Sequence, residues 1–248
     1  MSQYQWDWLV IFENVTDTDE FYYQWLISGL GWTLLIALSA WVIALILGTI
    51  IGTARTLPNK FVAGIATAYV ELFRNIPLIV QLFMWFFVLP EMVPTNIGNW
   101  MKQDMPHPGI ITSIIGLGLF TAARVAEQIR TGILALPRGQ KNAGLALGLT
   151  LAQTYRHVLL PMAFRVVIPP LTSEFMSIFK NSAVAYSITA TELFFQMKQI
   201  TGDYKPANQI EVVTIVGLIY ILVAFSANRI MTFIERRVQV PGYISGGK

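Results

Sequence analysis

The sequence predicts an all-α membrane protein with five transmembrane helices. Of its 248 residues, 54% are hydrophobic and only 12% are charged, whereas about 25% of the residues in a typical soluble domain are charged. The mean hydropathy is positive. At about 1.5 Å of rise per residue, the long apolar stretches can each cross a hydrocarbon core about 30 Å thick. We therefore expect one transmembrane domain over residues 25–235.

The chain is expected to begin with an interfacial segment, residues 1–24. This segment contains no Lys or Arg, so it does not resemble a cleaved signal peptide, which has a basic start. Its aromatic residues suit a position at the membrane interface, and a disordered acidic tail is the alternative. The first span covers residues 25–54. It carries a small-residue stripe that predicts close helix packing: Ala40, Ala44, Gly48 and Gly52.

The next four spans are predicted at residues 61–89, 110–134, 159–197 and 211–234. The fourth contains Pro169 and Pro170, where a regular helix is not expected because proline removes a backbone donor. This stretch is long enough for a kinked span plus a re-entrant or interfacial piece. Residues 236–248 are expected to form a tail.

Basic residues are unevenly distributed between the two sides of these spans. One set of ends carries Arg55, Lys60, Arg130, Arg138, Lys141, Arg156, Arg236, Arg237 and Lys248. The other carries only Lys102, Lys198 and Lys205. Because cytoplasmic loops are enriched in Lys and Arg, we expect the N-terminus outside and the C-terminus in the cytoplasm.

The segment between the third and fourth spans predicts two short cytoplasmic helices. Pro137 can occupy the first helical position of one helix, and Gly148 suits the left-handed residue that ends it. Thr150 and Gln153 have the spacing of a capping box, and the second helix is expected to stop before Pro161. The first helix would expose apolar side chains to water, which usually marks a partner site.

This cytoplasmic segment resembles the EAA loop of permease subunits of ABC importers. Ala143, Gly148 and Pro161 match the spacing of that loop. The family's Glu is Asn142 here and its second Ala is Gly144, so a salt bridge from that Glu is not expected.

Three further segments resemble motifs of the polar amino acid permeases, the HisMQ-like family. They are ELFRNIPLIVQLF (71–83), AEQIRTGILALPRGQ (126–140) and FKNSAVAYS (179–187). Around ELFRN and TAARVAEQ the chain looks most like the permeases for glutamate and aspartate. The matches follow one another in the family's order along most of the transmembrane domain.

The resemblance implies the type I ABC importer permease (MetI-like) architecture in a bacterial inner (plasma) membrane. The cytoplasmic coupling loop, residues 137–160, would dock on a cytoplasmic ABC ATPase dimer. The residues expected to couple to that ATPase are Pro137, Gly139, Asn142, Ala143, Gly144, Gly148, Val158 and Pro161. A second homologous permease subunit would pair with the chain; a heterodimer is favoured and a homodimer is the alternative. A periplasmic solute-binding protein would dock near residues 90–109 and 198–210.

Charged residues inside the spans are candidates for the substrate path, because such groups are costly at membrane depth. The candidate substrate-binding residues are Arg124, Lys180, Glu127, Glu71 and Arg74. Pairing of Glu71 with Arg74 and of Glu127 with Arg130 is the structural alternative. Arg124 is then left without an acid, and its guanidinium suits a carboxylate. Snorkelling of Arg124 to the surface is the competing interpretation.

Several chemistries are excluded by missing motifs. The chain has no G-x-x-x-x-G-K-[ST] loop, no G-x-S-x-G elbow and no metal-ligand spacing around its two histidines, so we expect no enzyme and no cofactor in this subunit. ATP and Mg would be used by the partner ATPase. The basic residues follow topology and do not indicate nucleic acid.

The function predicted from these features is ATP-driven import of polar amino acids, most specifically glutamate and aspartate. Import of glutamine, asparagine or basic amino acids is the near alternative. A proton-coupled secondary transporter using Glu71, Glu127 and Glu174, or a structural or regulatory membrane subunit, are the alternatives from other classes.

Overall fold

The computed structural model is almost entirely helical and describes residues 4, 6–15 and 19–238. The N-terminal part of the predicted interfacial segment and most of the predicted tail lie outside these residues. The helices are α1 (Tyr22–Ala54), α2 (Lys60–Asn75), α3 (Leu78–Phe83), α4 (Leu89–Met92), α5 (Thr95–Asn99), α6 (Pro108–Ala135), α7 (Arg138–Ala146), α8 (Leu151–Thr154), α9 (Leu160–Ser182), α10 (Leu193–Gln199) and α11 (Gln209–Val238).

Four helical stretches are long and apolar enough to cross a membrane, and α2 with the helices after it supplies a fifth if that bent pair counts as one span. The all-α fold class is therefore confirmed, and the described residues supply four to five spans where five were predicted. The second span predicted over residues 61–89 is not one continuous helix, because the chain bends by 105° between Lys60–Asn75 and Leu78–Met92. Pro77 favours this break, because proline disfavours the helical conformation at the preceding residue, and Ile76 is extended, with φ −96° and ψ 128°.

The fourth span is more regular than the prolines predict. Helix continues from Leu151 to Ile188, through Pro169 and Pro170, so both the expected stop before Pro161 and the irregular backbone at the proline pair are wrong. A π-helical turn, Tyr155–Leu159, directly precedes α9. Its wider turn leaves room for the ring of Pro161, which would crowd a carbonyl of a regular α-helix. Within a membrane, moreover, unpaired backbone groups are costly, so helix is kept where it can be.

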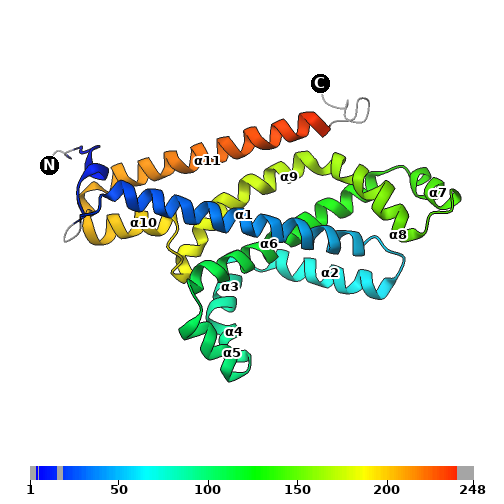
Figure 1. Ribbon diagram of the computed structural model, residues 1–248, viewed down its shortest axis with the longest axis horizontal. Coiled ribbons are helices and arrows are strands. Elements are labelled where there is room, and N and C mark those ends of the chain that lie inside the picture. Colours follow the sequence, from blue (N-terminus) through cyan, green and yellow to red (C-terminus); the bar gives the residue numbers. More distant parts are fainter. Residues whose placement is uncertain (1–3, 5, 16–18, 239–248) are drawn as a thin grey trace. The chain divides into compact units, whose positions relative to one another are not determined.

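The chain forms two compact units, and the four long helices contribute residues to both. The first unit comprises Met1–Ala40, Pro77–Gly118 and Ile178–Phe225. Its apolar core joins the start of α1, α10 and the start of α11, through Tyr22, Leu26, Leu193, Met197 and Val212. Figure 1 shows α10 beside the first turns of α1, as this core requires.

A buried carboxylate organises the beginning of α10. Glu192 is fully buried and accepts hydrogen bonds from the backbone N–H groups of Phe194 (2.9 Å) and Phe195 (2.8 Å). The Tyr220 hydroxyl donates to the same carboxylate at 2.9 Å. Because an unsatisfied buried charge is costly, these donors make Glu192 a structural cap of the first unit.

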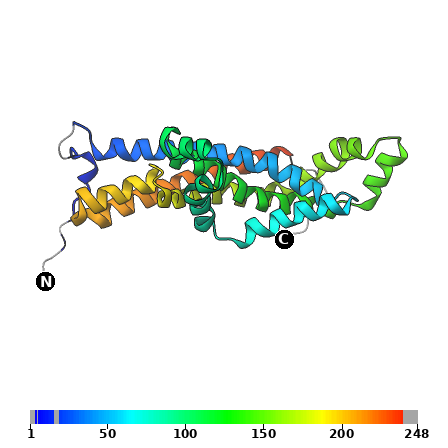
Figure 2. The ribbon, with the colours of Figure 1, turned by 90° about the horizontal axis from the view of Figure 1, so that it is seen from below.

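The second unit comprises Trp41–Ile76, Leu119–Ser177 and Ser226–Lys248. Helix α2 doubles back along the second half of α1 (Figures 1 and 2). The Asn59 side chain starts α2 by accepting from two backbone N–H groups. The small-residue stripe of α1 is buried, and a Cβ at Gly52 would lie 2.5 Å from the carbonyl oxygen of Ala126 on α6. The predicted packing face is confirmed for this pair of helices.

Candidate functional site

Charged side chains from three helices of the second unit meet around a small polar cavity of about 190 Å³. It is lined by Arg74 from α2, by Arg124, Glu127 and Gln128 from α6, and by Glu174 from α9. We call this the arginine–glutamate cavity. Its lining consists of charged and amide groups only, which is unusual within spans and typical of a polar ligand path.

Glu127 is the centre of the charge network around this cavity. Its carboxylate accepts a hydrogen bond from Arg55, lies 3.1 Å from Arg130 Nη1 and lies 3.6 Å from Arg74 Nη1. The predicted Glu127–Arg130 pair is confirmed. Arg74 pairs with Glu127 and not with Glu71, which is exposed, so the expected Glu71–Arg74 pair is wrong.

Arg124 has an acidic partner that the sequence argument left out. Its Nη1 lies 3.8 Å from Glu174 Oε1, and its guanidinium sits 5.0 Å above the Phe120 ring. The expectation of an unpaired Arg124 is therefore wrong. Because 45% of its side chain is still exposed, against 15% for Glu174, its remaining N–H groups are free to face the cavity.

The network carries more positive than negative charge. Among the described residues, Arg55, Arg74, Arg124 and Arg130 pair with two carboxylates, those of Glu127 and Glu174, so the network has a formal net charge of +2. Guanidinium groups stay protonated in proteins. The arrangement therefore attracts an anion, and the planar forks of the arginines suit a carboxylate.

Two predicted substrate-binding residues lie elsewhere. Glu71 and Lys180 are exposed, and neither lines the arginine–glutamate cavity. The sequence argument missed Arg55 and Gln128 and did not place Glu174 opposite Arg124. Arg55 follows the end of α1 and was expected in a loop, and the close packing of α1 against α6 brings it to Glu127.

The predicted coupling loop forms a short helical hairpin of α7 and α8 (Figure 1). Gly148 is left-handed, with φ +83°, and the Thr150 side chain completes the expected capping box with Gln153. Both caps are confirmed. Leu147, at the end of α7, is 82% exposed, and Leu145 is also exposed, so the first helix does present apolar side chains to its surroundings.

Gly144 explains how α7 approaches the following helix so closely. A Cβ at this position would lie 2.9 Å from Thr154 Cγ2 and 3.1 Å from its Oγ1. Thr is stiff at χ1, and its hydroxyl already donates to the Thr150 carbonyl at 3.0 Å. Glycine at this departure from the EAA pattern therefore permits the contact.

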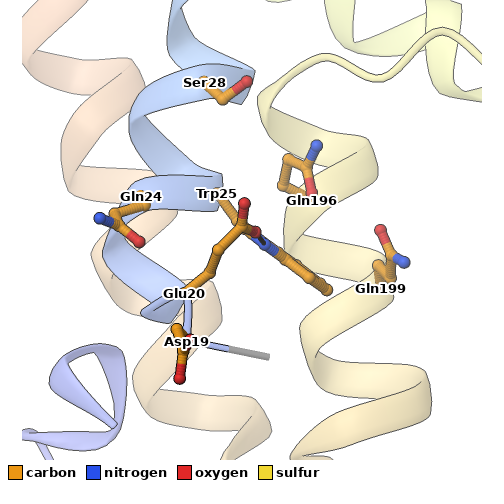
Figure 3. Close-up of a pocket in the computed structure, with 7 residues that line it drawn as sticks. All are labelled: Asp19, Glu20, Gln24, Trp25, Ser28, Gln196 and Gln199. Atoms are coloured by element: carbon orange, nitrogen blue, oxygen red, sulfur yellow. Dashed lines mark hydrogen bonds between the residues drawn. The ribbon is translucent and has the colours of Figure 1, made fainter. Parts of the chain in front are cut away.

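A second polar cavity, of about 540 Å³, lies in the first unit between the start of α1 and α10. Its lining is acidic and amidic: Asp19, Glu20, Gln24, Trp25, Ser28, Gln196 and Gln199. Figure 3 shows Trp25 projecting from α1 toward Gln199 on α10. The Trp25 indole N–H donates to Glu20 at 2.6 Å. These acceptors suit a cationic or hydrogen-bond-donating group.

Each of the two segments expected to face the binding protein contains a lysine that forms an ion pair within the first unit. Lys102 lies 2.5 Å from Glu91 in the hairpin that follows α3. The Lys205 ammonium donates to the Glu13 carboxylate, and this hydrogen bond raises the pKa of Lys205. Among the described residues, no cluster of three or more His, Asp or Glu side chains could hold a metal ion.

Comparisons with known proteins agree with this architecture. The sequence model of binding-protein-dependent transport system inner membrane components matches residues 44–240. The glutamate/aspartate import permease protein GltJ of Escherichia coli (strain K12) is 46% identical over 244 residues, 97% of this chain and 98% of GltJ. The glutamate/aspartate import permease protein GltK of Escherichia coli O6:H1 (strain CFT073) is 30% identical over 94% of this chain and 99% of GltK.

A solved structure of an amino acid ABC transporter with histidines shares the fold, with a TM-score of 0.71 and 29% identity. The match covers 87% of this chain and 95% of that chain. The predicted membrane-permease architecture is therefore confirmed.

Proposed function

Because the chain belongs to the family of binding-protein-dependent transport system inner membrane components, we propose that it is the permease subunit of an ATP-driven importer of glutamate and aspartate. The names of GltJ and GltK support this substrate class. The observation that carries the proposal is the positive excess of the charge network: two arginines and two glutamates line the cavity, and Arg55 and Arg130 add positive charge beside Glu127. An acidic amino acid is an anion with two carboxylates.

In this proposal the substrate passes the arginine–glutamate cavity during import. Arg124 binds a substrate carboxylate, and Arg74 supplies a second cationic group on the opposite helix. Gln128 offers an amide for the α-amino or carboxylate group. The two glutamates of the cavity can accept from the α-ammonium, so the lining matches each charged group of the substrate.

The partners follow from the same proposal. The coupling loop docks on a cytoplasmic ABC ATPase dimer, and the exposed Leu145 and Leu147 support this because apolar side chains on a wet surface mark a partner site. ATP and Mg are used there, not in this chain. A GltK-like second permease completes a heterodimer, since this chain is nearer to GltJ than to GltK. The N-terminus faces outside, where a solute-binding protein delivers the substrate.

ATP hydrolysis by the reconstituted transporter tests the proposal. The chain is co-expressed with its second permease and ATPase, placed in lipid discs, and mixed with the binding protein and single amino acids. We expect glutamate and aspartate to stimulate hydrolysis several-fold over arginine or glutamine. Stimulation by another amino acid would reassign the substrate, and glutamate uptake by the chain alone, driven by a pH gradient, would overturn the ATP-driven mechanism.

Gly144→Ala is expected to weaken ATPase binding by about three- to tenfold, because the new Cβ pushes α7 away from Thr154; overpacking of this kind costs about 1–3 kcal/mol. The measurement is the amount of ATPase that co-purifies with tagged permease. Thr154→Ala removes the clashing methyl group, so the double variant should regain most of the binding. Equal losses in the single and double variants would contradict the steric explanation.

A further inference from the structure

We propose that Tyr155, Thr56, Arg55 and Glu127 form a relay that carries movement of the coupling loop to the arginine–glutamate cavity. In this relay Tyr155 and Arg55 are positioning residues, which act through Glu127 and not by touching substrate. The inference rests on the proposed function, in which that loop binds the ATPase. All four residues belong to the second unit.

The first link joins the coupling loop to the end of α1. Tyr155 opens the π-helical turn after α8 and is buried. Its hydroxyl donates to the Thr56 carbonyl at 2.9 Å and lies 3.1 Å from the Thr56 hydroxyl. Thr56 lies in the turn just beyond the end of α1, and Tyr155 supplies a hydrogen-bond donor to its backbone carbonyl. A shift of α8 therefore acts directly on the backbone that follows α1.

The second link is the neighbouring residue. Arg55 is bonded to Thr56 in the chain, and only 10% of its side chain is exposed. Its Nε donates to Thr67 Oγ1 on α2 at 3.3 Å, while Nη1 donates to Glu127 on α6. The guanidinium is planar and rigid. Displacement of the backbone at Thr56 must therefore move this fork relative to one of the two helices.

The third link reaches the cavity itself. Glu127 shares its two oxygens among three arginines, and it lines the cavity with Arg74. When Arg55 withdraws, the carboxylate is free to move closer to Arg74 or Arg130. Arg74 is then either neutralised or released toward the substrate. Such an exchange between discrete pairings is a two-state element of the kind that couples distant sites.

The same contacts could also serve only to stabilise the fold. The measurement must therefore distinguish a purely structural role from transmission of movement to the cavity. If the contacts are only structural, their loss lowers the amount of active transporter, so glutamate uptake and ATP hydrolysis fall together. If the contacts form a relay, their loss uncouples ATP hydrolysis from glutamate transport. The informative quantity is therefore the number of glutamate molecules imported per ATP hydrolysed, which does not depend on how much protein assembles.

The experiment compares Tyr155→Phe with Tyr69→Phe in the complete reconstituted transporter. Tyr69 also donates its hydroxyl to a backbone carbonyl in the same unit, that of Leu119 at 2.8 Å, and neither this bond nor its ring contact with Phe73 involves the four relay residues. Loss of one hydrogen bond corresponds to about a three- to tenfold effect. We expect Tyr155→Phe to lower glutamate imported per ATP by that factor and Tyr69→Phe to leave the ratio unchanged.

Arg55→Lys provides the second arm, because lysine keeps the charge but cannot hold Thr67 and Glu127 with one fork. Its ratio should fall to a similar extent. The double variant Tyr155→Phe/Arg55→Lys should be no worse than the more severe single variant, since both interrupt one path.

Two results would overturn the relay: an unchanged ratio in Tyr155→Phe, or losses that multiply in the double variant. Failure of the proposed function looks different, because the wild-type complex would then show no glutamate-dependent ATP hydrolysis at all.

Discussion

Arg124→Ala is expected to reduce the initial rate of glutamate import by about a hundredfold. A hydrogen bond to a charged group is worth about 1.5–3 kcal/mol, and 1.4 kcal/mol corresponds to about a factor of ten. The substitution also leaves Glu174 without its cationic partner, so a carboxylate of the cavity would repel the substrate. The measurement is uptake of labelled glutamate by the reconstituted complex, normalised to the ATPase that co-purifies.

Three further variants decide what Arg124 does. Arg124→Lys should retain part of the activity, because it keeps the charge but loses the planar fork. Lys180→Ala should change uptake by less than about twofold, since Lys180 does not line the cavity. If Arg124→Ala/Glu174→Ala imported glutamate at the wild-type rate, Arg124 would only neutralise Glu174 and the substrate assignment would fail.

Gly52→Ala is expected to destabilise the protein strongly, although it adds only a single methyl group. Its Cβ would lie 2.5 Å from the Ala126 carbonyl oxygen and 2.9 Å from Ile129 Cβ, and backbone cannot move aside as a flexible side chain can. Overpacking costs about 1–3 kcal/mol. At about 2–4 °C per kcal/mol for a domain of this size, the Tm of the purified chain in detergent should fall by several degrees.

Gly31→Ala is the matched control for this prediction. Gly31 lies in the same helix, and a Cβ there meets nothing within 4 Å. Because alanine is the better helix former, the Tm should stay constant or rise slightly. Equal Tm losses in the two variants would contradict the packing explanation, because they would show that α1 requires glycine for its backbone conformation and not for close packing against α6.

The fold was predictable where a local rule was sufficient. Spans follow from apolar length, and the caps at Gly148 and Thr150 follow from left-handed glycine geometry and capping-box spacing. The failures at Pro77 and Pro161 have a common cause. A proline predicts that a helix is disturbed, but it does not predict how. The helix breaks at Ile76, before Pro77, whereas it continues past Pro161 next to a π-helical turn.

The candidate site was predictable only in part, because charge partners were sought along one helix. The spacing of Glu127 and Arg130 gave their pair correctly. Arg124 and Glu174 lie fifty positions apart in the chain, and Arg55 reaches Glu127 only because α1 and α6 pack closely. The structural role of Glu192 could not be predicted from charge pairing, because its hydrogen-bond donors are backbone N–H groups and the hydroxyl of Tyr220.

The surplus of arginine over glutamate in the second unit has an electrical consequence. A glutamate anion that enters a cell with a negative interior works against the membrane voltage, at about 2.3 kcal/mol per 100 mV for each charge. Fixed arginines lower the barrier part of the way across, but they leave the voltage difference between the two sides unchanged. In the proposed function they set how fast the anion moves, while ATP hydrolysis by the partner supplies the direction. Glu127 and Glu174 then have a second use: by offsetting part of the positive charge, they keep the anion from being trapped halfway.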